Sequence, residues 1–172
     1  MQGYEGTLKF VKGDVTKPKY TQENEIAIIP HVANDLGVMG SGVALGLKRA
    51  FAGVEYYYKK SGHTLGTNSW VNPNSERNNV IVVNMVAQKG TYNENNPIPI
   101  KYSALIKCME SVVEDVINPI YTEDKYKGKI PVIHMPEFGS LRAGGNFEFI
   151  KELVREIWIE RGISVVIYSY DG

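Results

Sequence analysis

The chain has 172 residues, of which 43% are hydrophobic and 22% are charged, so its length fits one domain and is too short for two ordinary ones. The 19 Lys and Arg residues balance the 19 Asp and Glu residues, so the charge gives no indication of nucleic-acid or anionic-membrane binding. A single cysteine, Cys108, excludes an internal disulfide framework and a cysteine-based zinc site.

The first ten residues lack the apolar segment of a signal peptide, and no apolar run approaches the roughly 18 residues of a membrane span. We therefore expect a single-domain, monomeric, cytoplasmic protein with no membrane partner. Short β-branched runs predict strands at residues 7–11, 25–30, 67–71, 80–86, 130–135 and 163–168. Apolar spacings of three and four predict helices at residues 52–60, 101–117 and after Asn146, the last ending at Gly162.

Residues 118–129 are expected to form a charged connection, and residues 34–46 to turn helical in their second half. Because β-branched runs alternate with amphipathic helices, the pattern predicts a sheet with helices on both faces. In such α/β sheets, ligands bind beyond the carboxyl ends of the strands.

Two glycine-rich loops, at residues 37–46 and 138–145, each follow a strand and lead into a helix. The free N–H groups of a helix N-terminus suit phosphate, and glycine lets the backbone approach an anion closely. Two such loops predict a ligand with a diphosphate that links two sugars. The G-x-G-x-x-G fingerprint fails because Leu45 stands where its third glycine is required, and no P-loop is present. Alternatively, the glycines serve only turns and packing.

Four short motifs occur in an order that resembles the macro domain family. They are GDVT at residues 13–16, HVAND at 31–35, MGSGVA at 39–44 and MPEFGSLRAGGNF at 135–147. The spelling is similar to the branch that holds yeast-type ADP-ribose-1″-phosphate phosphatases and the terminal ADP-ribose protein glycohydrolase. The resemblance implies a three-layer α/β/α fold with a mixed, mainly parallel central sheet. It also implies ADP-ribose or a derivative as the partner, with no metal and no cofactor.

The resemblance further implies which residues contact ADP-ribose. Asp14 and Val15 would contact the adenine, and an aromatic residue of the last strand would lie beside it, with Tyr168 favoured over Tyr170. The two glycine-rich loops would hold the diphosphate through Gly40, Ser41, Gly42, Val43, Phe138, Gly139, Ser140, Leu141, Arg142, Ala143, Gly144 and Gly145. Asp14 could instead be a turn or cap residue, and the tyrosines ordinary packing residues.

Asn34 and Asp35 are the catalytic candidates, because the distal ribose should lie near them. An asparagine can bind sugar hydroxyls both as donor and as acceptor, and Asp35 could act as a general base toward water. Asp35 could equally be a solvated loop acid or a helix cap. His31 and His134 lie in or near strands, where a histidine is more often a packed residue than a catalyst.

In the terminal glycohydrolase, a lysine after the middle strand forms a sugar adduct and an aspartate of the second loop assists. This chain has Ala143 at the aspartate position, and Lys89 lies just beyond the corresponding strand, so that chemistry is not expected. Arg142 could bind a phosphate through its planar guanidinium group, or could be a solvated loop charge.

Three functions remain open. The first is phosphatase action on ADP-ribose-1″-phosphate, which the Ala143 spelling favours. The second is hydrolysis of an ADP-ribosyl group from protein or nucleic acid, or deacetylation of O-acetyl-ADP-ribose, in the same pocket. The third is a non-catalytic reader of ADP-ribose.

Overall fold

The computed structural model describes residues 4–73, 79–139 and 143–169, and within these ranges six strands form one sheet in the order β1-β6-β5-β2-β4-β3. The strands are β1 (Leu8–Lys12), β2 (Glu25–Asn34), β3 (Asn68–Val71), β4 (Val80–Gln88), β5 (Ile130–Pro136) and β6 (Val165–Ser169). Neighbouring strands run parallel except for β3, which pairs antiparallel with β4. The mixed, mainly parallel sheet predicted from the sequence is confirmed.

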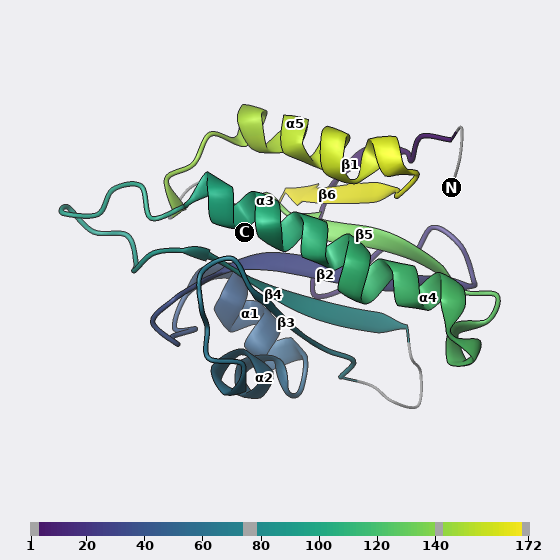
Figure 1. Ribbon diagram of the computed structural model, residues 1–172, viewed down its shortest axis with the longest axis horizontal. Coiled ribbons are helices and arrows are strands. Elements are labelled where there is room, and N and C mark those ends of the chain that lie inside the picture. The colour runs from purple at the N-terminus through teal and green to yellow at the C-terminus, as the bar shows by residue number, and fades with distance from the viewer. Residues whose placement is uncertain (1–3, 74–78, 140–142, 170–172) are drawn as a thin grey trace.

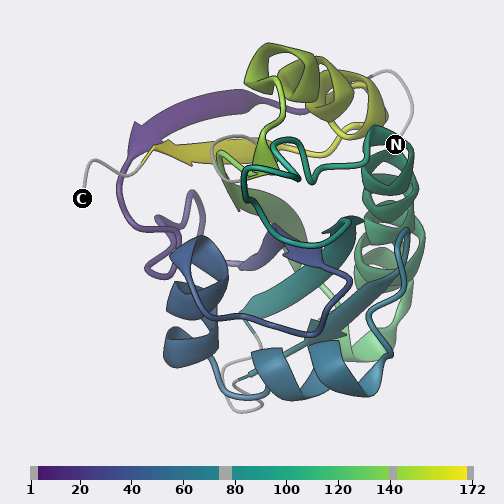
Figure 2. The same ribbon diagram turned by 90° about the vertical axis from the view of Figure 1, so that its left-hand side faces the viewer.

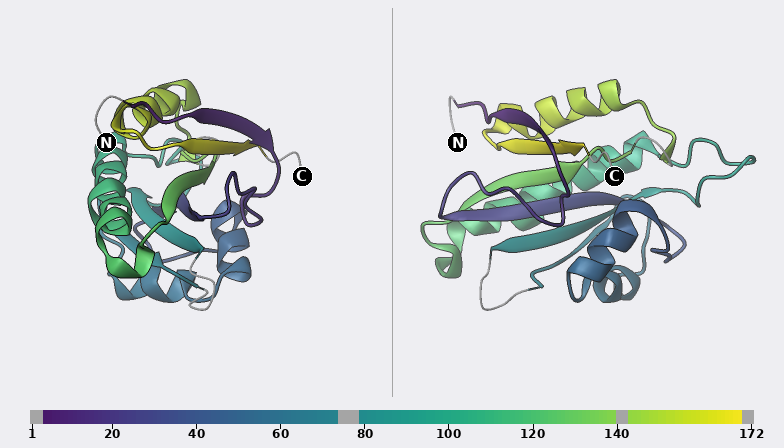
Figure 3. Two further views of the ribbon diagram at one scale, coloured as in Figure 1. Left: turned by 90° about the vertical axis from the view of Figure 1, so that its right-hand side faces the viewer. Right: turned by 180° about the vertical axis from the view of Figure 1, so that it is seen from behind.

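Helices cover both faces of this sheet. They are α1 (Gly42–Ala50), α2 (Val54–Lys60), α3 (Tyr102–Ser111), η1 (Val112–Ile117), α4 (Asn118–Thr122), η2 (Asp124–Tyr126), α5 (Phe147–Ile157) and η4 (Ile159–Arg161). Figure 1 shows α3, α4 and α5 over one face and α1 and α2 over the other. Figures 2 and 3 show α1 and α3 on opposite sides of the sheet, which is the expected three-layer α/β/α arrangement.

The central strand β2 explains why its sequence reads as a continuous apolar run. Ile26 and Ile28 belong to the core under α3 and α5, whereas Ala27 and Ile29 belong to the core under α1 and α2. Side chains alternate between the two faces of a strand, so a strand covered by helices on both sides needs apolar residues at every position. Burial of each large aliphatic side chain contributes about 1.5–3 kcal/mol.

The helix that begins at Tyr102 extends further than the sequence predicted. It was expected to end at residue 117, but it passes through the π-helix η1 into α4, so part of the expected connection 118–129 is helical. In the π-helix the Asn118 N–H donates to the Val113 carbonyl, five residues back. Pro119 follows at once in the first turn of α4, so the change from α-helical to π-helical pairing coincides with a residue that has no N–H group to donate.

The sheet opens at the carboxyl ends of β2 and β5. The pairing of β2 with β5 ends at Ile28 and Ile133, whereas its pairing with β4 continues to Asn34 and Gln88. Near that end, β4 carries one extra residue between the partners of Ala33 and Asn34, which makes a β-bulge. The connection from β4 to α3 extends away from the body of the protein at the left of Figure 1. This end of the sheet is where a ligand was expected to bind.

Candidate functional site

A cleft of about 520 Å³ lies where β2 and β5 have separated. Its walls come from the end of β2, the loop into α1, the first turn of α1, the end of β4 with the loop that follows, and the loop after β5. The described residues that line it are 31–34, 38–44, 88, 91, 92, 136–139 and 143. The cleft thus joins both glycine-rich loops with the HVAND segment.

The first glycine-rich loop brings Gly40, Ser41, Gly42 and Val43 together in the cleft wall. The first helical hydrogen bond runs from the Leu45 N–H to the Ser41 carbonyl, so the N–H groups of the preceding turn have no acceptor within the helix. The first turn contains no acidic residue. A Cβ atom added at Gly40 would meet nothing within 4 Å. The first turn of α1 therefore offers N–H donors that have no acceptor within the helix, a partial positive charge and space for a close anion.

The second glycine-rich loop contributes in part. Phe138, Gly139 and Ala143 line the cleft, whereas Gly144 and Gly145 do not. The Gly145 N–H donates to the Gly139 carbonyl at 2.8 Å, and a Cβ atom at Gly144 would lie 2.3 Å from a backbone oxygen of the neighbouring loop. These two glycines therefore allow close backbone packing. The predicted contacts Ser140, Leu141 and Arg142 lie outside the described residues, as does Tyr170.

Asn34 lines the cleft, but its side chain is largely occupied by its own loop. Its Oδ1 accepts hydrogen bonds from the Leu36 and Val38 N–H groups, and its Nδ2 donates to the Val38 carbonyl at 2.9 Å. The buried Tyr58 hydroxyl also contacts Asn34, at 2.5 Å from its carbonyl oxygen and 2.8 Å from Oδ1, and accepts from the Gly37 N–H. Asn34 and Tyr58 therefore fix the loop that leads to the first helix.

Asp35 lies outside the cleft lining of the described residues. Its Oδ1 accepts a hydrogen bond of 2.8 Å from the Gly90 N–H, and its carbonyl oxygen lies 2.7 Å from His63 Nδ1. Its N–H donates to the Gln88 carbonyl. In this arrangement Asp35 ties the end of β2 to the turn after β4.

Asp14 and Val15 lie outside the described cleft lining. Asp14 Oδ1 accepts hydrogen bonds from the N–H (2.9 Å) and the hydroxyl (2.7 Å) of Thr16, which closes the turn after β1. Val15 is buried in the core under α1. Thr16 approaches Gly46 of α1, so the GDVT turn packs against the helix whose first turn lines the cleft.

Tyr168 is also placed outside the described cleft wall, and it is 2% exposed. Its hydroxyl lies 2.7 Å from His134 Nδ1 and accepts a hydrogen bond of 2.8 Å from the Lys19 N–H. His134 Nε2 contacts the buried carboxylate of Glu25. Each donor has an acceptor when Tyr168 donates to Nδ1 and the Nε2 hydrogen of His134 goes to Glu25.

Glu25 is ionised within this chain of hydrogen bonds. Burial raises the pKa of its carboxyl, but hydrogen bonds from His134 and from the N–H and hydroxyl of Thr21 outweigh burial, so the pKa is below the usual 4.5. The network joins β2, β5 and β6 in the core. His134 is thus a packed, hydrogen-bonded residue, as the sequence favoured.

Comparison with known proteins rests on structure, because the chain matches no protein-family model and no curated protein. A protein of unknown function from Bacteroides thetaiotaomicron is 28% identical, with a TM-score of 0.76 over 95% of this chain and 98% of that chain. A macrodomain protein from Streptomyces coelicolor is 25% identical, with a TM-score of 0.69 over 94% of this chain and 98% of that chain. This chain has the macro domain fold.

A third similar structure is that of Thermosipho africanus DarTG in complex with ADP-ribose. It is 17% identical to this macro domain, with a TM-score of 0.64 over 94% of this chain and 41% of that chain. At this identity the similarity concerns the fold.

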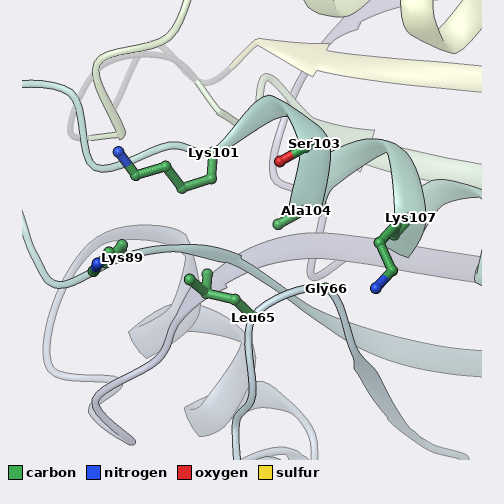
Figure 4. A pocket seen from close by; sticks show the side chains of 7 residues that line it. All are labelled: Leu65, Gly66, Lys89, Lys101, Ser103, Ala104 and Lys107. Atoms are coloured by element: carbon green, nitrogen blue, oxygen red, sulfur yellow. The ribbon is translucent and has the colours of Figure 1, made fainter.

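Lys89 of the macro domain enters a second cleft, on the α3 side of the sheet. This cleft of about 360 Å³ is lined by Lys89, Lys101 and Lys107, together with Leu65, Gly66, Ser103 and Ala104. Figure 4 shows the Lys89 side chain beside Leu65, across the cleft from Lys101. Gln88, the last residue of β4, lines the first cleft, and Lys89, which follows the strand, lines the second. No lysine appears among the described residues of the first cleft.

Several residues of the macro domain cleft were not identified from the sequence. Gln88, Thr91, Tyr92 and Glu137 line it, and Tyr58 holds its first loop. Tyr58 is one of three consecutive tyrosines, so nothing in the sequence distinguishes it from its exposed neighbours. Thr91 and Tyr92 belong to the connection from β4 to α3, and its amino-acid sequence does not indicate that it reaches the cleft. Among the described residues, no three His, Cys, Asp or Glu side chains are grouped to hold a metal ion, and no described helix is long and apolar enough to cross a bilayer.

Proposed function

We propose that the cleft of this macro domain binds ADP-ribose. The observation that carries the proposal is the N-terminus of α1, whose first turn lines a cleft of about 520 Å³ with N–H groups that have no helical acceptor. Such a terminus favours phosphate, and the volume falls in the usual range for small-molecule sites. The Thermosipho protein of similar fold, solved with ADP-ribose, supports the same ligand.

Calorimetric titration of ADP-ribose into wild type, Gly40→Ala and Gly46→Ala tests the proposal. The Gly40→Ala methyl group meets nothing in the protein but occupies space at the phosphate loop, so we expect a fold that is retained and affinity that falls roughly tenfold or more. Gly46 is on the same helix and does not line the cleft, and its Cβ would make an ordinary 3.9 Å contact. Gly46→Ala should bind as wild type does. Equal affinity of both variants would place the ligand elsewhere, and no binding to wild type would refute the proposal.

For the reaction, we propose hydrolysis of the phosphomonoester of ADP-ribose-1″-phosphate. Water attacks phosphorus, the P–O bond to the sugar breaks, and inorganic phosphate and ADP-ribose are released. Two observations support this choice over a sugar–lysine adduct: Lys89 lies in the second cleft, and Ala143 offers no acid. Glu137 is the carboxylate among the described lining residues, and we assign it the role of orienting the water. Asp35 holds the turn at Gly90.

Phosphate release by Glu137→Gln and Asp35→Asn separates the two carboxylates. We expect Glu137→Gln to lower kcat by about 10²–10⁴, the usual contribution of a general base. Asp35→Asn keeps an oxygen that can accept from the Gly90 N–H, so its kcat should remain near that of wild type. Loss of turnover in Asp35→Asn alone would make Asp35 the base instead. Tight binding of ADP-ribose without phosphate release by wild type would refute the reaction and identify a non-catalytic reader.

A further inference from the structure

The second cleft, on the α3 side of the sheet, gathers positive charge without a counter-charge. It is lined by Lys89, Lys101 and Lys107, and no acidic residue appears among its described lining residues. Within the described ranges, none of these three lysines makes an ion pair. The whole chain has equal numbers of basic and acidic residues, so the grouping is a local feature of the cleft. A cleft lined by charges of one sign raises the local concentration of ions of the opposite sign.

Backbone hydrogen bonds to the end of β4 hold the walls of this cleft in place. The Gly66 N–H donates to the Val86 carbonyl at 2.8 Å, and the Lys101 N–H donates to the Ala87 carbonyl at 2.8 Å. Lys89 follows directly at the end of the same strand. The lysine-bearing segments are therefore fixed relative to one another before a ligand arrives, and binding does not require the backbone to be ordered.

The charges are distributed unequally between the two ends of the cleft. Figure 4 shows Lys89 and Lys101 at one end and Lys107 at the other, with Leu65 and Ala104 between them. Lys107 follows Lys101 by six residues, so their backbones lie about 9 Å apart along the axis of α3. The cleft thus has two ammonium groups at one end, an apolar middle and one ammonium group at the other end.

The N-terminus of α3 adds to the end that has two lysines. The first helical hydrogen bond runs from the Leu105 N–H to the Lys101 carbonyl at 2.9 Å, so the N–H groups of the preceding turn have no acceptor within the helix. Ser103, which lines the cleft, belongs to this turn, and the turn contains no acidic residue. A group with more than one negative charge therefore fits this end better than the end with Lys107 alone.

We propose that the second cleft binds a small organic phosphate that carries another acidic group at its far end. A phosphate monoester has a charge of about −1.5 to −2 near neutral pH, which matches Lys89, Lys101 and the N-terminus of α3. A carboxylate has a single charge, which matches Lys107. The apolar part of the ligand would lie against Leu65 and Ala104.

Two further points support a ligand of this class. Lysine binds phosphate as a point charge and does not need the fixed bidentate orientation of arginine. The cleft volume of about 360 Å³ falls in the usual range for small-molecule sites. This site is separate from the first cleft, and the inference does not depend on the proposed binding of ADP-ribose.

Titration with 6-phosphonohexanoic acid, followed by amide nitrogen-15 NMR, tests the proposal. This probe has a phosphonate and a carboxylate at the two ends of an alkyl chain, and hexylphosphonic acid is the matched probe without the carboxylate. We expect the amide resonances of Gly66 and Ala104 to move, with higher affinity for the probe that has both groups, and with lower affinity at higher salt. The amides of Gly42 and Val43 report separately on the first cleft. Movement of those two alone, or no movement at all, would overturn the proposal.

Three lysine variants assign the two ends, with affinities read at Gly66 and Ala104. Lys107→Gln should weaken 6-phosphonohexanoic acid roughly 1.5- to 5-fold, as expected for the loss of one exposed ion pair, and leave hexylphosphonic acid unchanged. Lys101→Gln should weaken both probes. Lys127 is an exposed lysine outside the cleft lining, so Lys127→Gln is the control for net charge and should bind both probes as wild type does. The proposal fails if Lys107→Gln and Lys127→Gln have the same effect, or if Lys107→Gln weakens both probes equally.

Discussion

Acidification should destabilise the folded protein through His31. The pKa of this imidazole is about 4 in the folded protein, against an ordinary value of 6.5, because burial disfavours the charged form. Between these two values the unfolded chain binds a proton that the folded chain does not, so the free energy of unfolding falls as the pH is lowered. At about 1.4 kcal/mol for each pKa unit, the contribution of His31 is complete above pH 6.5 and decreases by about 3 kcal/mol as the pH approaches 4.

Urea unfolding from neutral pH to about pH 4 measures this contribution, with the fluorescence of the fully buried Trp158 as the probe. His31 Nε2 lies 2.5 Å from Asn84 Oδ1. His31→Gln provides the comparison, because glutamine is neutral throughout and still offers an N–H donor to Asn84. Other groups that titrate, such as Glu25, are present in both proteins and cancel in the difference. Wild type should lose about 3 kcal/mol relative to the variant over this range. A difference that does not change with pH would refute the assignment of a buried, neutral His31.

Three further outcomes are expected. Tyr168→Phe should lower the free energy of unfolding by about 1–3 kcal/mol, because His134 Nδ1 and the Lys19 N–H both lose their partner; unchanged stability in urea would show that the hydroxyl is dispensable. Gly145→Ala should destabilise the second loop and weaken ADP-ribose binding, because the new Cβ would lie 2.1 Å from a backbone oxygen; wild-type melting and affinity would contradict this. Burial raises the pKa of the Cys108 thiol to about 12, so a thiol reagent should detect no reactive thiol in the native protein near neutral pH and one after denaturation.

The parts of the molecule that the sequence predicted well are those governed by local rules. The side chain of Asn146 caps α5 by accepting from the N–H groups of Glu148 and Phe149, as its position before an amphipathic run predicted. Gly162 ends the following turn in the left-handed conformation. The first glycine-rich loop lies in the cleft wall. Its sequence indicated this position, because a strand followed by glycines and a helix places a helix N-terminus at the edge of the sheet.

The side-chain roles could not be read from the sequence, because they depend on partners that are distant along the chain. Asp35 meets the Gly90 N–H, 55 residues later, and Tyr168 meets His134, 34 residues earlier. The spacing of residues indicates whether a segment is a helix or a strand and which of its faces is buried. It does not indicate which polar group of a distant segment will lie within hydrogen-bonding distance. The same limit applies to His31, whose Nε2 meets the side chain of Asn84, 53 residues later.

The β-bulge near the end of β4 has a consequence for how this family of sites could change by insertion or deletion. Gln88, at the end of β4, lines one cleft, and Lys89, the next residue, lines the other. A one-residue shift of a strand exchanges the faces of all the side chains that follow. Deleting Ala87, the extra residue of the bulge, would therefore direct Lys89 toward the ligand cleft. Deletion of one codon would thus place an amine in a cleft whose described wall has no lysine. Such a deletion is a short evolutionary route from a site without a lysine to a site with a nucleophilic amine on the same fold.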